Sequence, residues 1–151
     1  MAATLTSTVT DSVTLNGSVR GTTNAYVANN ITDVFERIVT CTFGQETTIV
    51  RFSTSAYANP VAIDVSRVRY VRVTNLDPTE KVLLSVVTTA SSATVRLMAG
   101  GSFILSTGNE VVRGEEDVTP SFATLEDLAS LIIKPVSGSV SSQVEVFVAI
   151  E

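Results

Sequence analysis

The sequence predicts an all-β fold: an antiparallel β-sandwich, jelly-roll-like, with an extended N-terminal arm and at most one short helix. Val, Ile and Thr make up 53 of the 151 residues, and β-branched side chains favour strands over helices. Apolar and polar residues alternate along many short segments. Turn residues separate these segments about every 8–12 positions without strand–helix alternation, which is typical of a sandwich or jelly roll.

The N-terminal segment has the clearest alternation. Every even position in residues 4–15 carries a hydroxyl side chain, and several odd positions are apolar. A period of two over about twelve residues indicates a strand with one wet face. Asn16-Gly17 then supplies the residues that a tight turn with positive φ needs. This segment can be a core strand, or an extended arm that pairs with a neighbouring subunit.

We expect two parts in the chain: an N-terminal arm or first strand at residues 1–20, and a single β-sandwich domain at residues 21–151. The length fits one domain. Residues 21–33 are small, polar and rich in Asn, which predicts mostly loop. Two alternating segments, residues 34–43 and 47–53, flank a turn and predict a hairpin.

Further strands are expected along the rest of the chain. Asn59-Pro60 breaks it, and the predicted strands that follow are 67–74, 81–89, 94–98, 102–106 and 144–150. Residues 81–89 are the most apolar, so we expect a central strand there. Thr124 and Asp127 have the spacing of a helix N-cap, with leucines at helical spacing after Thr124. We therefore expect a short helix or 3₁₀ turn from residue 124.

The composition argues against several classes of function. The chain has no His and one Cys, so the usual general base is absent and neither a zinc site nor an internal disulfide can form. The net charge of −5 argues against binding to nucleic-acid phosphates. No apolar run reaches the roughly 18 residues of a membrane span, and the first residues lack a signal-peptide pattern. We expect no nucleic-acid, membrane or small-molecule partner.

Few residues are candidates for chemistry. Cys41 lies in an alternating apolar set, which favours a small buried side chain over a reactive thiol. The acidic residues 115–117 lack the spacing of a calcium loop, which favours a solvated loop. We therefore expect no catalytic residue, no metal ligand and no cofactor.

The arm and an arginine cluster are the predicted contact residues. Lysine side chains on an exposed strand edge discourage pairing with another chain. This chain has two Lys, at 81 and 134, so its exposed edges favour strand pairing with a neighbour. Arg67 and Arg69 share a face of one strand, where they can pair with acids at a subunit contact or solubilise a sheet face. The predicted contact set is Leu5, Thr6, Thr8, Val9, Thr10, Val13, Arg67 and Arg69.

Four blocks of the sequence resemble small β-sandwich virion proteins of tailed bacteriophages. They are I-T-D-V-F-E-R-I-V-T (31–40), Y-V-R-V-T-N-L-D (70–77), K-V-L-L-S-V-V-T (81–88) and V-R-L-M-A-G-G-S-F-I-L (95–105). The resemblance spans about half the chain, roughly residues 31–106, and consists of strand-and-turn patterns. It implies a capsid decoration (cement) protein, or a tail or neck accessory, and it carries no catalytic residues.

From these observations we expect a non-enzymatic virion protein, made in the host cytoplasm, that stabilises a phage head by bridging capsid subunits. Its partners would be the major capsid protein or other virion proteins, and it would form a homo-oligomer, with a trimer favoured. Two alternatives remain open. One is a structural component of the tail, neck or fibre base, and the other is a carbohydrate-binding receptor-recognition module.

Overall fold

A computed structural model of the chain describes residues 2–54, 61–113, 125–136 and 141–151. Within these ranges the chain forms strands and one 3₁₀ turn, η1 (Val65–Arg67). The strands are β1 (Ala3–Thr10), β2 (Val13–Leu15), β3 (Ser18–Arg20), β4 (Thr23–Ile31), β5 (Asp33–Cys41), β6 (Thr47–Ser53), β7 (Ile63–Asp64), β8 (Val68–Asn75), β9 (Val82–Thr88), β10 (Ser92–Leu97), β11 (Ser102–Leu105), β12 (Leu128–Pro135) and β13 (Ser142–Ile150). The predicted all-β class is confirmed.

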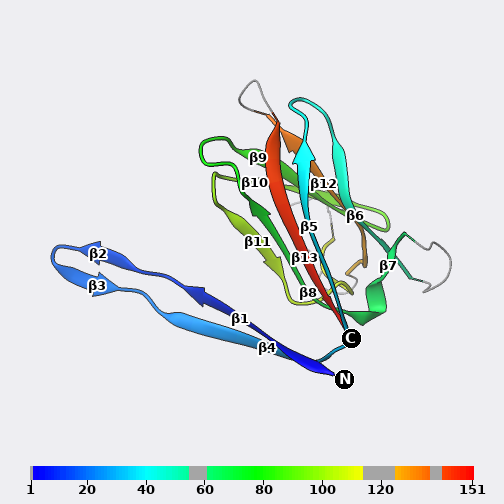
Figure 1. Cartoon of the computed structure of the whole chain (residues 1–151), viewed down its shortest axis with the longest axis horizontal. Coiled ribbons are helices and arrows are strands. Elements are labelled where there is room, and N and C mark those ends of the chain that lie inside the picture. The colour runs from blue at the N-terminus through cyan, green and yellow to red at the C-terminus, as the bar shows by residue number, and fades with distance from the viewer. Residues whose placement is uncertain (1, 55–60, 114–124, 137–140) are drawn as a thin grey trace.

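Eight strands form a sandwich with jelly-roll topology (Figure 1). One sheet has the order β11-β8-β13-β5, and the other has the order β10-β9-β12-β6 with the short β7 added in parallel to β6. The antiparallel pairs are nested: β5 with β13, β6 with β12, β8 with β11, and β9 with β10. A long hairpin of four strand pairs that wraps into two sheets is the jelly-roll arrangement.

The core lies between the two sheets. Alternate residues of β8, β9 and β13 point inward, and Leu84, Leu131 and Val146 are among the fully buried side chains. Strand β9 lies between β10 and β12, which confirms the predicted central strand at residues 81–89. Cys41 is buried in this core, and burial raises the pKa of its thiol. Its predicted role as a small buried side chain is confirmed.

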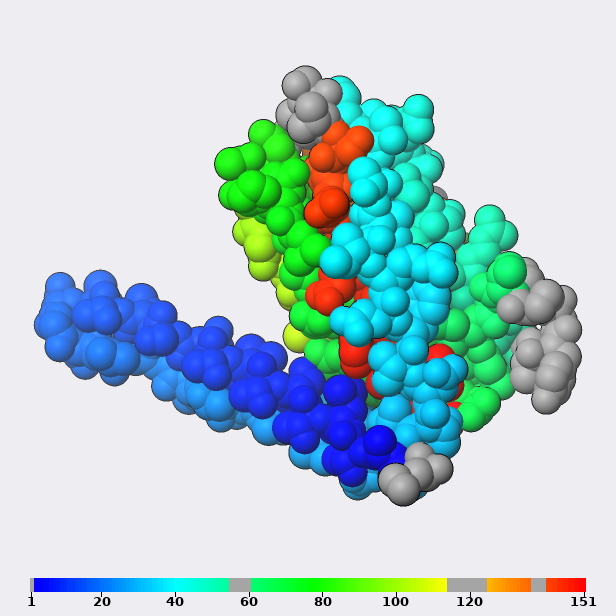
Figure 2. Space-filling view, viewed as in Figure 1, coloured from blue at the N-terminus to red at the C-terminus, as the bar shows by residue number. Residues whose placement is uncertain are grey.

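The N-terminal residues form a hairpin arm that projects from the sandwich (Figures 1 and 2). Strand β1 pairs with β4, and β2 pairs with β3 at the tip of the arm. Asn16 and Gly17 connect β2 to β3 with φ angles of 50° and 77°, as a two-residue hairpin turn requires. The arm leaves the sandwich at the end where β13 finishes, and the Thr32 N–H donates to the Ile150 carbonyl at 2.8 Å.

The prediction of mostly loop at residues 21–33 was wrong. Strand β4 covers Thr23–Ile31, because β1 supplies a hydrogen-bonding partner along most of its length. The Asn residues that suggested a loop lie on an exposed strand, where low strand propensity costs little. The expected domain boundary after residue 20 therefore falls inside the arm, which continues to Ile31.

Two further predictions were wrong for reasons of topology and register. The segments at 34–43 and 47–53 are strands β5 and β6, but they lie in different sheets and do not form a hairpin. The expected helix is replaced, from Leu128 onward, by strand β12. A bulge between Leu128 and Ser130 adds one residue to the strand, so Leu128 and Leu131 both point inward. Leu128 and Leu131 therefore lie on one face of a strand although they are three residues apart, a spacing that is also found on one face of a helix.

Asp77 holds the turn after β8, since its carboxylate accepts hydrogen bonds from the Thr79 and Glu80 N–H groups at 3.0 and 2.8 Å. Asn59-Pro60, the acidic residues 115–117 and the proposed cap at Thr124 lie outside the described residues. In the part of the chain that the structure describes, we find no helix with the length and hydropathy needed to cross a membrane.

Candidate assembly surface at the hairpin arm

The distal part of the arm lies in solvent on both faces. Every residue from 8 to 27 is exposed, including the large apolar side chains of Val13, Leu15 and Val19 at 57%, 58% and 71%. Asp11 and Arg20 are the only charged residues between positions 2 and 31. The arm is thus a two-stranded ribbon with two charged side chains, and it exposes apolar side chains to water.

The base of the arm packs on the outer face of the four-stranded sheet. Ala28 and Ile31 of β4 are buried against Tyr70 of β8 and Ala149 of β13, with Leu5 of β1 beside them. This small cluster is separate from the sandwich core. It fixes where the arm leaves the sandwich, and it covers one end of the sheet face.

Two tyrosines tie the arm to the sheet. Their rings stack with centroids 6.2 Å apart, Tyr26 from β4 on Tyr70 from β8. The Tyr70 hydroxyl shares a 2.8 Å hydrogen bond with the Ser7 hydroxyl of β1. The Tyr26 hydroxyl donates toward the carbonyls of Arg69 and Ser106 at 3.1 and 3.3 Å. These contacts hold the base of the arm at a defined position on the sheet.

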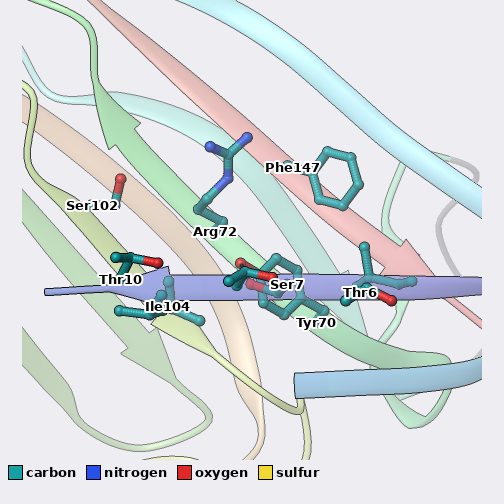
Figure 3. Close-up of a pocket in the computed structure, with 11 residues that line it drawn as sticks. Thr6, Ser7, Thr10, Tyr70, Arg72, Ser102, Ile104 and Phe147 are labelled. Carbon is teal, nitrogen blue, oxygen red and sulfur yellow. Dashed lines mark hydrogen bonds between the residues drawn. The ribbon is translucent and has the colours of Figure 1, made fainter. Parts of the chain in front are cut away.

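A groove of about 510 Å³ lies between β1 and the outer face of the sheet (Figure 3). Residues 5–10 line one side of it, and Tyr70, Arg72, Ile104 and Phe147 line the other. The guanidinium of Arg72 forms an ion pair with Glu145 at 2.8 Å and lies over the Phe147 ring. The groove is therefore lined by apolar and hydroxyl side chains more than by free charge.

The predicted contact residues fall in two places. Leu5 is half-buried at the base of the arm, while Thr6, Thr8, Val9 and Thr10 line the groove from β1 and are exposed. Val13 lies farther out, in β2 at the tip of the arm. The structure therefore brings six of the eight predicted residues together on one arm.

The two arginines of the predicted set lie beside the end of β13 and have partners within the chain. Arg69 forms an ion pair with the Glu151 side chain. Arg67 donates from Nε to the Glu151 carbonyl, and from a terminal nitrogen to the Thr32 hydroxyl at 3.1 Å. These contacts support the exit of the arm from the sandwich. Arg72 lies apart from them, on the outer sheet face.

Sequence reasoning missed the residues that anchor the arm. Val71 and Val73 point into the core, so Tyr70, which precedes Val71 by one residue, points outward. The register of β8 shifts at its start. Phe147 likewise alternates with the buried Val146 and Val148. An aromatic residue on the outward face of a strand was the available signal that something covers this face.

Among residues 2–54, 61–113, 125–136 and 141–151, no three His, Cys, Asp or Glu side chains gather as metal ligands would. Comparison with models of known protein families and with curated protein sequences found no match to this chain.

Proposed function

We propose that this chain is a non-enzymatic structural protein of a tailed-phage virion. It acts as a capsid decoration (cement) protein whose arm bridges neighbouring capsid subunits. The observation that carries the proposal is the arm itself, with exposed residues from 8 to 27 and two charges along its length. We propose a phage particle because residues 31–106 resemble phage virion sandwiches.

The physics of the arm favours a partner. A two-stranded hairpin is marginally stable in water on its own, and each aliphatic side chain that becomes buried contributes on the order of 1.5–3 kcal/mol. Val13, Leu15 and Val19 are available for such burial at the tip of the arm. A strand advances about 3.3 Å per residue, so the exposed part of the arm extends roughly 30 Å. That length suits contact with an adjacent subunit.

The topology is compatible with this role but does not select it. Jelly rolls occur in viral capsid proteins and also in lectins, so the fold alone does not define function. A carbohydrate site usually presents exposed aromatic rings. Of the tyrosines in the described residues, Tyr70 is buried, and Tyr26, which is 38% exposed, stacks on it at the base of the arm. Because these two rings hold the arm on the sheet, they favour a structural role over a carbohydrate site.

A shortened arm tests the proposal. Residues 9–24 are replaced by Asn-Gly, which joins Thr8 to Ala25, a pair that already lies opposite in the hairpin. We expect the thermal midpoint of the sandwich to be unchanged and binding to particles that lack this protein to be lost. The control is Arg96→Glu, an exposed position on the distant strand β10, which should bind normally.

Two results bear directly on the proposal. Full-affinity binding by the folded short-arm variant would overturn the bridging role of the arm. Imaging of labelled wild-type protein on intact particles tests the location: label on the head supports a decoration protein, and label confined to the tail or neck contradicts it.

A further inference from the structure

The arm tip presents a small mixed patch on one face. Val13 pairs with Arg20 across the hairpin, and Leu15 follows Val13 by two residues, so these three side chains share a face. All three are exposed, and Arg20 has no ion-pair or hydrogen-bonding partner in the described part of the chain. The tip patch (Val13, Leu15 and Arg20) therefore combines two aliphatic groups with one free positive charge.

The outer face of β5 presents the complementary patch. Val34, Glu36 and Ile38 alternate along this edge strand and point away from the core. Val34 and Ile38 are 45% and 59% exposed, and the Glu36 carboxylate has no ion-pair or hydrogen-bonding partner among the described residues. The β5 patch (Val34, Glu36 and Ile38) thus combines two aliphatic groups with one free negative charge.

The remaining charges near the β5 patch are already engaged or face elsewhere. Glu145 lies opposite Ile38 on β13 and pairs with Arg72 at 2.8 Å. Arg37 points to the other face of β5, where it lies over the Phe35 ring. Asp33 accepts a hydrogen bond from the Val34 N–H at 2.8 Å. Glu36 is therefore the carboxylate of this patch that is free to receive a cation.

We propose that the arm tip of one copy docks on the outer face of β5 of a second copy, with Arg20 paired to Glu36 and the aliphatic side chains packed around them. This inference rests on the proposed function of the arm and assigns the surface that receives it. Each chain holds both patches, and its own arm projects away from its β5 (Figure 2). The contact is head-to-tail, so copies close into a ring where the rotation allows.

Charge reversal tests the pairing in the full-length chain. Mass is measured by sedimentation equilibrium over a concentration series that reaches the micromolar range, where weak interfaces associate. We expect Arg20→Glu and Glu36→Arg each to weaken self-association about tenfold, because each places like charges together. The double variant restores opposite charges and should return to within about threefold of wild type.

The control variant is Arg96→Glu, which changes net charge as Arg20→Glu does but lies outside both patches. It should associate as the wild type does. Circular dichroism of every variant should show an unchanged thermal midpoint, since each substituted side chain is exposed. A monomeric wild type, an equal loss in the control, or a double variant that fails to recover would each overturn the inference.

The two proposals can fail separately. If the wild type binds particles through its arm but remains monomeric in solution, the β5 patch is not the receptor, and the decoration role stands. If the charge pair governs self-association but the short-arm variant still binds particles, the decoration role fails and the contact between copies stands.

Discussion

The arm and the sandwich are built from similar residues but are stabilised in different ways. Both are rich in Val and Thr and both consist of antiparallel strands. In the sandwich, each inward-facing side chain meets a second sheet, and residues such as Leu84 are fully buried. In the arm, no second layer lies beyond its base, and Leu15 is 58% exposed. A β-branched composition therefore gives a stable domain only where two sheets can bury their apolar faces against each other.

The largest expected effect comes from a matched pair of leucines. Leu84→Ala should lower the free energy of unfolding by about 2–5 kcal/mol, because it leaves a cavity in the core. Leu15→Ala should change it by less than about 0.5 kcal/mol in the monomer. Urea denaturation followed by circular dichroism measures both. A large loss from Leu15→Ala would show that the arm contributes to the stability of the sandwich.

An intermediate effect is expected at the base of the arm. Tyr26→Ala removes a stacked ring and two hydrogen bonds, so docking of the arm on the sheet should weaken by about 1–2 kcal/mol. Amides at the base of the arm, in residues 3–7 and 28–31, should then exchange hydrogen faster, with no change in the sandwich. Tyr26→Phe keeps the ring and should show a smaller increase. Equal exchange in all three proteins would mean that Tyr26 does not hold the arm.

The smallest effect is a pH dependence that belongs to the sandwich. The Glu126 carboxylate accepts hydrogen bonds from the hydroxyls of Thr88 and Ser91, and these bonds lower its pKa. Its folded pKa lies below its unfolded value, so the stabilisation is present above the ordinary carboxyl range of about 4 and is lost as pH falls through the folded pKa.

Acid titration of stability checks this account. The unfolding free energy of wild type should fall more steeply below about pH 4 than that of Glu126→Gln, which cannot take up the proton. Asp77, whose pKa is lowered by backbone N–H groups of Glu80 and Thr79, retains its own contribution in that variant. Identical pH slopes for the two proteins would contradict the role of Glu126.

Local patterns predicted the elements better than their partners. The alternation in residues 144–150 and the Asn16-Gly17 turn depend on neighbours in sequence, and both are confirmed. The separation of β5 from β6 into different sheets depends on nested pairing with distant strands, which no local pattern contains. The bulge before Ser130 places two inward-facing leucines three residues apart, and this spacing led to the wrong prediction of a helix.

The candidate surface was partly predictable for the same reason. The alternating pattern of residues 4–15 predicted a strand, since that pattern is local, but it left open whether the strand belongs to the core or to an arm. Its second strand, its anchor on Tyr70 and the β5 patch require knowledge of which surfaces meet across the fold. Arg67 and Arg69 were plausible contact residues by type, yet Glu151 lies beside both in the folded chain.

Hydrogen exchange measured by mass spectrometry, on dilute protein and on the assembled form, tests the central claim most directly. The account predicts that amides in residues 8–27 exchange rapidly when the chain is alone and become protected on assembly, while the sandwich strands β8, β9 and β13 stay protected throughout. Arm amides that are already protected in the isolated chain, or that remain unprotected in the assembly, would contradict it.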